Sequence, residues 1–238
     1  MINAILFDLD GTLVHYSQDF IAAYFTKLKK VFERLRLDAE LAIKGVWAGS
    51  KAMLLNSGER LNSECFWAEV SRVMGLSHEQ LKSVEAACDA FYASSEFDSV
   101  KSIMNNADME LPRRLVRGLT ARGFTLVLAT NPLFPECAIA TRLGWVGLSL
   151  SDFQLVTHYN NSTYCKPNLG YYREILNKIG KEPRQCLMAG NSPLEDMCAG
   201  ELGAETFLVN ECIDNESGID ISGFRSGTLA DLEAYFLK

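Results

Sequence analysis

Long apolar runs, proline and excess positive charge are scarce in this sequence. No stretch approaches the ~20 apolar residues that a membrane-spanning helix needs. Only six prolines occur in 238 residues, which argues against a collagen-like or proline-rich disordered chain. Lysine and arginine number 23 against 30 aspartates and glutamates, a net charge of −7. Because this charge does not attract nucleic acid or anionic membranes, we expect neither as a partner and favour a small molecule.

The cysteines follow no paired pattern. There are seven, an odd number, without a CxxC pair, so the sequence favours neither a disulfide framework nor a zinc knuckle. The apolar segment before Asp8 is too short for a signal-peptide core and has no basic leader. Together these features predict a cytoplasmic protein with reduced thiols. The cysteines are Cys65, Cys88, Cys137, Cys165, Cys186, Cys198 and Cys212.

The first part of the chain predicts one strand followed only by helices. Residues 2–7 are apolar and β-prone and run into the carboxylates and glycine of FDLDGT, as a buried strand feeding a loop does. From Ser17, a candidate N-cap, apolar residues up to Leu35 recur at helical spacing. Further helices are predicted at 39–55, 63–74 and 77–92, the last opened by a capping box of Ser77 and Gln80.

After about Ser102, short apolar runs alternate with amphipathic helices. This alternation is typical of βαβ units and a parallel sheet. It predicts an α/β fold with a doubly wound sheet of five strands, formed by residues 1–14 and 103–238, and an all-helical subdomain inserted at 15–102. The later strands are expected at 124–129, 153–157, 186–189 and 206–209, and the intervening helices are expected to end at Gly123, Gly144, Gly180 and Gly203.

Two carboxylates, Asp8 and Asp10, stand at the carboxyl end of the first strand, where parallel sheets present their ligands. Gly11 allows a sharp turn there. One carboxylate would serve as a nucleophile or metal ligand and the other as a proton shuttle; the plainer alternative is a pair of turn carboxylates. A calcium loop is excluded, because its sixth and twelfth positions would be Leu13 and Asp19 instead of Gly and Glu.

Two later strand ends also carry polar groups. Thr130 and Asn131 can donate hydrogen bonds to a small anion. Lys166 stands on the loop before a predicted helix, and Pro167 suits the first turn of that helix. Each group alone is as well explained by an ordinary turn or a solvated lysine.

The loop after the 186–189 strand supplies oxygen ligands from Asn191 and Asp196. Together with Asp8 they provide the oxygen donors that Mg²⁺ prefers. Glu195 has a structural explanation, because it stands three residues after Ser192 in a predicted capping box.

In order and in position, these pieces resemble the motifs of the haloacid dehalogenase superfamily: a DxDGT loop, a strand-end Thr or Ser, a lysine and an acidic loop. The helical insertion resembles the cap that this superfamily has between its first and second motifs. The resemblance implies a Rossmann-like core and a phosphatase-type hydrolase. The matching positions are 8–12, Thr130, Lys166 and 190–196.

By this resemblance Asp8 attacks phosphorus and forms an aspartyl-phosphate, while Asp10 protonates the leaving oxygen and then deprotonates the hydrolytic water. Lys166 is the third catalytic residue, because its charge counters that of the phosphoryl group. The resemblance also implies Mg²⁺ as cofactor. The phosphoryl oxygens would be bound by Thr12, Thr130, Asn131 and Lys166, and Mg²⁺ would be held by Asp8, Asp10, Asn191 and Asp196.

One position departs from the family pattern, because many relatives have Asp where this chain has Asn191. The implied function is hydrolysis of a small phosphorylated metabolite by a monomer or homodimer. Asp10 favours phosphoryl chemistry over carbon–halogen cleavage, since the metal-free dehalogenases keep no acid there. The alternatives are a phosphotransferase or phosphomutase, a phosphonate hydrolase with Lys51 as its amine, and a catalytically weakened phosphate-binding protein.

Substrate-selecting residues are not evident in the sequence. His15 and Tyr16 follow the first loop and either contact substrate or are structural, and the structural interpretation is favoured. Trp47 is expected to pack on an apolar helix face, and Lys51 and Arg60 are expected to be solvated.

Overall fold

A parallel sheet of six strands forms the centre of the computed structural model, which describes residues 1–15, 17, 19–106 and 108–237. The strands are β1 (Ala4–Phe7), β2 (Thr125–Leu128), β3 (Leu155–Val156), β4 (Cys186–Gly190), β5 (Glu205–Val209) and β6 (Ser226–Gly227). Their order is β3-β2-β1-β4-β5-β6. In β1, Ala4 lies opposite Thr125 of β2 and Cys186 of β4. All of β1 is buried, which explains its unbroken apolar run.

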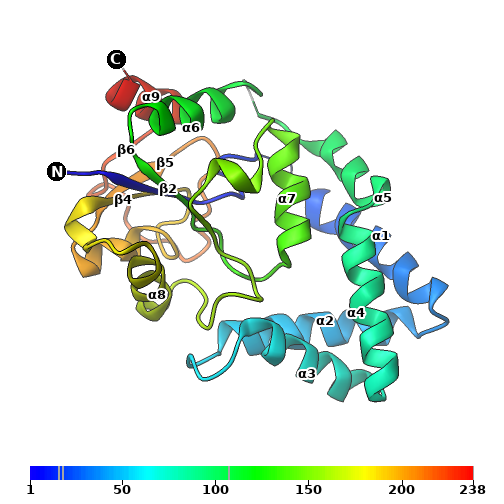
Figure 1. Cartoon of the computed structure of the whole chain (residues 1–238). Helices are drawn as coiled ribbons and strands as arrows, with labels where there is room; N and C mark the ends of the chain where they lie inside the picture. The colour runs from blue at the N-terminus through cyan, green and yellow to red at the C-terminus, as the bar shows by residue number, and fades with distance from the viewer. Residues whose placement is uncertain (16, 18, 107, 238) are drawn as a thin grey trace.

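Helices cover both faces of the sheet (Figure 1). They are α6 (Leu111–Ala121), α7 (Glu136–Trp145), α8 (Leu169–Ile179) and α9 (Leu229–Leu237). Successive side chains of β1 point to opposite faces: Ile5 and Phe7 join the apolar cluster of α6, α7 and α9, whereas Ala4 and Leu6 join that of α8. The prediction of a doubly wound α/β sheet is therefore confirmed.

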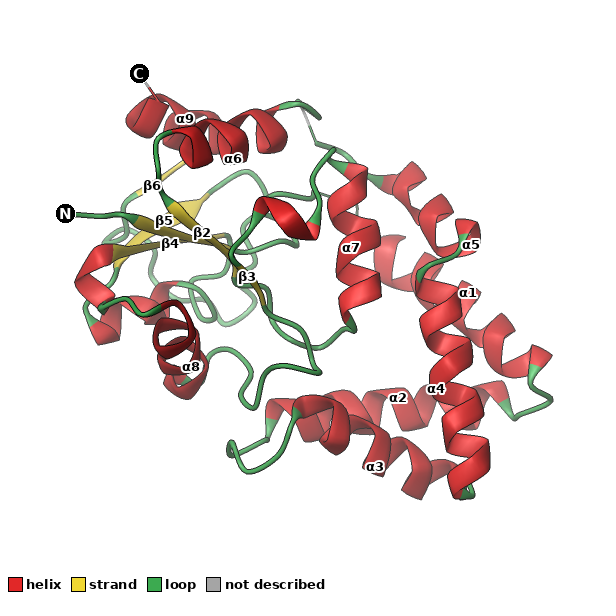
Figure 2. Cartoon of the chain, in the orientation of Figure 1, coloured by secondary structure: helices red, strands yellow, loops and turns green. Residues whose placement is uncertain are grey.

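Between β1 and β2 the chain is helical, and the described residues from 19 to 103 contain no strand (Figure 2). The elements are α1 (Asp19–Arg34), α2 (Ala39–Leu54), α3 (Asn62–Met74), α4 (His78–Tyr92), α5 (Ser95–Asp98) and a 3-10 helix, η1 (Ser99–Ile103). Gly49 lets α2 approach α3, because a Cβ there would lie 2.6 Å from the Phe66 ring. The capping box of Ser77 and Gln80 is present. This arrangement is consistent with an inserted helical cap, whose boundaries at 15 and 102 stay a prediction.

Aromatic side chains join these helices to the core. The Phe20 ring of α1 meets Trp145 of α7 edge-on, with centroids 6.3 Å apart, and Phe97 lies 5.7 Å from the same indole. The two parts therefore share one apolar cluster. Within the described ranges, no helix has both the length and the apolar character needed to cross a bilayer.

Some local predictions are wrong. The predicted strand at 153–157 contributes only Leu155–Val156, and β6, a Ser-Gly pair with no apolar signal, was not predicted. The predicted helix end at Gly144 is wrong, because Gly144 lies inside α7. The glycine with a left-handed backbone after this helix is Gly147, with φ of 70°. Pro167 precedes α8 instead of lying in its first turn, because Asn168 is the N-cap. The helix end at Gly180 is confirmed, with φ of 64°.

Candidate active site

A cavity of about 640 Å³ opens at the carboxyl ends of the central strands. Parallel strands bring their carboxyl ends to one edge, so loops far apart in sequence meet there. The cavity wall includes side chains from each of the predicted loops except the Lys166 loop. They are Asp8 and Asp10 after β1, Thr130 and Asn131 after β2, and Asn191 and Asp196 after β4.

Two glycines allow these loops to approach closely. Gly11 has φ of +83°, and a Cβ on it would lie 2.2 Å from Nδ2 of Asn191. A Cβ on Gly190 would lie 2.2 Å from the carboxyl carbon of Asp196. No side chain fits at either position, so the contact between the loops after β1 and β4, and the packing of the β4 loop on itself, depend on glycine.

Lys166 forms the buried centre of the site. Its Nζ lies 2.7 Å from Oδ1 of Asp8 and 2.6 Å from Oδ1 of Asp196, and its side chain has no exposed surface. Burial opposes the lysine charge, but Asp196 and Asp8 outweigh it and raise the pKa of Lys166 well above its usual value. The lysine is therefore a fixed cation that joins the first and last motif loops.

Asp8 is the carboxylate between Lys166 and the cavity. Burial raises its pKa to about 8; Lys166 acts against this, while Asp196 and Asp10 add to it. Its side chain is 10% exposed, whereas that of Lys166 behind it is sealed. Further positive charge beside Asp8 would favour its ionised form.

Asp196 is held from two sides. Besides the Lys166 contact, its Oδ2 accepts a hydrogen bond of 2.9 Å from the Ser192 backbone N–H. The predicted capping box is correct only in part: the Glu195 N–H donates to Oγ of Ser192 at 3.3 Å, but no α-helix begins there. The segment is a turn followed by the 3-10 helix η4 (Met197–Leu202).

The Glu195 carboxylate accepts hydrogen bonds from Nδ2 of Asn131, at 3.1 Å to each oxygen, instead of capping a helix. Oδ1 of Asn131 accepts one from the Lys166 backbone N–H at 3.2 Å. Burial raises the pKa of Glu195 above its usual value. Asn131 therefore lies in the cavity wall with its side chain bridging two other loops, and its role in phosphate binding stays a prediction.

Asp10 has an ion-pair partner that sequence reasoning missed. Its Oδ2 lies 2.6 Å from Nη1 of Arg142, a residue of α7 whose side chain is 1% exposed. In the sequence Arg142 stands in an apolar helix, and nothing local to it indicates a carboxylate partner 132 positions away.

Three of the residues predicted to bind phosphate or metal form hydrogen bonds with other groups of the protein. Nδ2 of Asn191 donates to the Cys212 carbonyl at 2.7 Å, and its Oδ1 accepts from Oγ1 of Thr12 at 3.3 Å. Thr12 is fully buried and lies outside the cavity wall. Thr130 does line the wall, and its carbonyl accepts from the hydroxyls of Thr157 and Tyr171 at 2.7 and 2.9 Å.

The donor set fits a hard cation better than a soft one. Asp8, Asp10, Asn191 and Asp196 all contribute to the cavity wall, and their donors are oxygens. Within the described residues, no three His, Cys, Asp or Glu side chains are grouped closely enough to hold a metal ion by themselves. A cation with few protein ligands and several waters, such as Mg²⁺, matches this arrangement.

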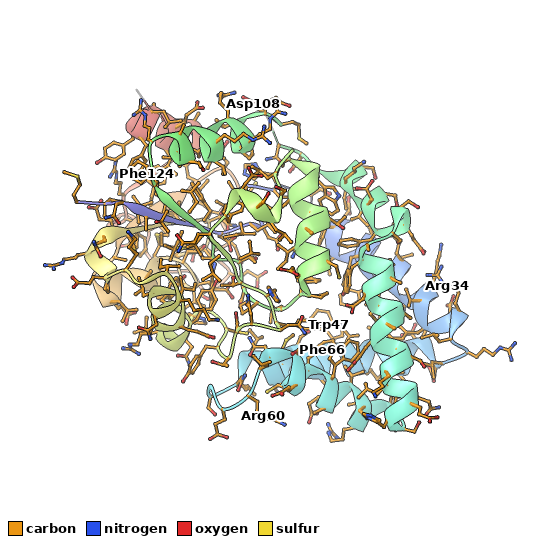
Figure 3. All side chains as sticks on the ribbon, in the orientation of Figure 1. Arg34, Trp47, Arg60, Phe66, Asp108 and Phe124 are labelled. Atoms are coloured by element: carbon orange, nitrogen blue, oxygen red, sulfur yellow. The ribbon has the colours of Figure 1, made fainter. Side chains whose placement is uncertain are left out.

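The junction residues have structural contacts. His15 is buried, with Nε2 2.9 Å from the Thr12 carbonyl, and Tyr16 lies outside the described residues. Trp47 stacks on Phe25 with ring centroids 5.1 Å apart, so it packs on an apolar side chain of α1, although 56% of its surface stays exposed. Lys51 and Arg60 are exposed, as expected, and Figure 3 shows Arg60 at the edge of the molecule beside α2 and α3.

The family model for a haloacid dehalogenase-like hydrolase matches residues 2–202. The sequence matches no curated protein.

Solved structures with a similar fold cover nearly all of the chain. A HAD phosphatase from Thermococcus onnurineus aligns with a TM-score of 0.58 at 18% identity, covering 98% of this chain and 97% of that one. CbbY from Rhodobacter sphaeroides, in complex with phosphate, gives 0.58 at 16% identity, covering 98% and 96%. A HAD family enzyme from Bacteroides thetaiotaomicron, in complex with magnesium and inorganic phosphate, gives 0.51 at 16% identity, covering 92% and 100%.

Proposed function

We propose that this chain, which belongs to the haloacid dehalogenase-like hydrolases, is a Mg²⁺-dependent phosphatase of a small phosphorylated metabolite. The observation that carries the proposal is Lys166, buried between Asp8 and Asp196 at distances of 2.7 and 2.6 Å. This contact joins the first, third and fourth motif loops, and it places the Asp8 carboxylate at the border of the cavity. Such a carboxylate is suited to nucleophilic attack on phosphorus.

Each step of the proposed reaction belongs to a residue in or beneath the cavity wall. An oxygen of Asp8 forms a bond to phosphorus as the bond to the leaving alkoxide breaks, and Asp10 gives that alkoxide its proton. Asp10 then removes a proton from water, which attacks phosphorus, frees phosphate and restores Asp8. Lys166 orients Asp8 and stabilises charge on the phosphoryl oxygens throughout.

The proposed metal residues are Asp8, Asp196, Asn191 and the Asp10 carbonyl. A bound Mg²⁺ would neutralise phosphoryl charge and favour the ionised form of Asp8. Asn191 in place of an acid removes one charge from this set, which leaves Asp8 and Asp196 as its two carboxyl side chains.

Metal removal is the first test of this proposal. We expect phosphate release from para-nitrophenyl phosphate and from a panel of metabolite esters to fall to background in EDTA and to return with excess Mg²⁺. An anionic nucleophile cannot readily approach an anionic ester without the added positive charge. Equal rates with Mg²⁺ and with EDTA would contradict the metal dependence. Binding of phosphate without release from any ester would instead favour a phosphate-binding protein.

The cavity wall further supports a substrate with no second anionic group. Among the described lining residues none is Lys, Arg or His. The acidic ones are Asp8, Asp10, Glu195, Asp196, Asp214 and Glu216. Asp214 and Glu216 belong to the loop after β5, which is anchored where the Asp214 N–H donates to the Asn191 carbonyl at 3.1 Å. A leaving group with an amine or hydroxyls suits this wall better than one with a carboxylate.

Phosphoethanolamine and phosphoglycolate, which are matched in size and opposite in leaving-group charge, test this preference. We expect kcat/KM to be higher for phosphoethanolamine by about tenfold, which corresponds to ~1.4 kcal/mol of charge interaction. Replacing Asp214 and Glu216 by Asn and Gln should reduce the ratio, whereas Glu205→Gln, on β5 outside the cavity wall, should not. A preference for phosphoglycolate would contradict this assignment.

The alternative of an amine-assisted phosphonate hydrolase gains no support. Its candidate amine, Lys51, is exposed on α2 and is absent from the described cavity wall.

A further inference from the structure

Arg142 is a buried cation that the reaction described above does not use. It lies on α7, and its side chain is 1% exposed. Burial of a guanidinium has a large desolvation penalty unless a carboxylate pairs with it. In the described chain that carboxylate is Asp10, with Oδ2 at 2.6 Å from Nη1. The pair therefore links the floor of the cavity to a helix of the core.

The geometry makes Arg142 the anchor of the Asp10 carboxylate. The second oxygen, Oδ1, is buried and has no hydrogen-bond partner among the described residues. The orientation of this carboxyl group consequently depends on the bond to Arg142. An uncharged side chain at position 142 would leave both oxygens without an anchor.

Arg142 is itself fixed by its surroundings. Its guanidinium carbon lies 4.5 Å from the centre of the Phe134 ring, and its Nε donates to the Ala138 carbonyl at 3.4 Å. Phe134 lines the cavity and also meets Tyr24 and Tyr92 of the helical region, at centroid distances of 5.8 and 6.0 Å. The guanidinium thus has one position, set by packing from both parts of the molecule.

We propose that Arg142 is a positioning residue that holds Asp10 in the orientation for proton transfer to the leaving oxygen. The proposal rests on the phosphatase function and on Asp10 as its acid. Its consequence is specific to the leaving group. An alkoxide leaves with the proton from Asp10, so it requires an oriented carboxyl group, whereas para-nitrophenolate leaves without one.

The test compares kcat/KM for glycerol 2-phosphate and para-nitrophenyl phosphate in wild type, Arg142→Met and Arg142→Lys. This parameter reports the steps up to departure of the leaving group, so it is insensitive to the later hydrolysis of the aspartyl-phosphate. In Arg142→Met we expect a loss on the order of 100-fold for the alkyl ester and of less than about tenfold for the aryl ester. Arg142→Lys should recover part of the alkyl activity, because it restores a cation near Asp10.

The Asp10→Asn background provides the matched control. There, adding Arg142→Met should leave the ratio of alkyl to aryl activity unchanged, because the group to be positioned is gone. Equal losses for both esters in Arg142→Met, or no loss for either, would show a structural ion pair and overturn the proposal. The activity of the wild type, measured first, tests the phosphatase function by itself. A change in the ratio of alkyl to aryl activity between wild type and variants then reports on Arg142 alone.

Discussion

Asp8→Asn is expected to reduce phosphate release by on the order of 10⁴-fold or more, the scale seen when a catalytic nucleophile is removed. The amide has nearly the shape of the carboxylate, but it cannot form the acyl-phosphate bond. Lys166 keeps its contact with Asp196 at 2.6 Å, so the loops should stay in place. The measurement is phosphate release from para-nitrophenyl phosphate with saturating Mg²⁺.

The control for this variant is Asp220→Asn, because Asp220 is exposed and lies outside the cavity wall. It should retain wild-type activity. Acid-quenched mass spectrometry adds a second measurement: wild type should carry a phosphoryl group on the peptide that contains Asp8, and Asp8→Asn should not. Phosphate release from Asp8→Asn at the wild-type rate would mean that another group is the nucleophile.

Lys166→Met is the second change with a large expected effect, on both activity and stability. Loss of a buried, preorganised positive charge at the phosphoryl group should lower kcat by on the order of 10³-fold. The same change leaves Asp8 and Asp196 buried and unpaired, which should lower the free energy of unfolding by about 3 kcal/mol. Chemical denaturation and phosphate release, measured on the same preparation, check the two parts separately.

Lys101→Met provides the contrast, because Lys101 also pairs with a carboxylate, Asp98 at 2.8 Å, but on the surface. A surface ion pair contributes little to stability, so this variant should be close to wild type in both measurements. If Lys166→Met kept wild-type activity, the lysine would have no role in the reaction. If it kept wild-type stability, Asp8 and Asp196 would have found other partners.

The central strand and its loop were predictable because their signals are local. The apolar run of β1 is followed directly by Asp8, Asp10 and Gly11, and any parallel strand delivers such residues to the edge of the sheet. The capping box at Ser77 is equally local, since its bonds join residues three apart. Such features depend on neighbouring residues in the chain, so they can be predicted without the fold.

The partners of the wall residues were not predictable. Glu195 fits a capping box by its spacing, yet its carboxylate binds Asn131, 64 positions away. Nothing in the sequence around Arg142 distinguishes it from other helix residues, yet it forms an ion pair with Asp10. For Glu195 the long-range contact competes with a local capping bond, and for Arg142 it competes with hydration. In both cases the packing of the folded chain decides which interaction forms.

Local sequence is enough to predict the α/β class, the helices between β1 and β2, and the loops that carry Asp8, Lys166 and Asp196, because periodicity and turn chemistry act over a few residues. Only the folded chain shows that Lys166 lies between two carboxylates, that Arg142 pairs with Asp10, and that an acidic loop after β5 lines one side of the cavity. These features arise where strand ends meet, and the order of strands in the sheet, which places them together, is set by burial of the whole core.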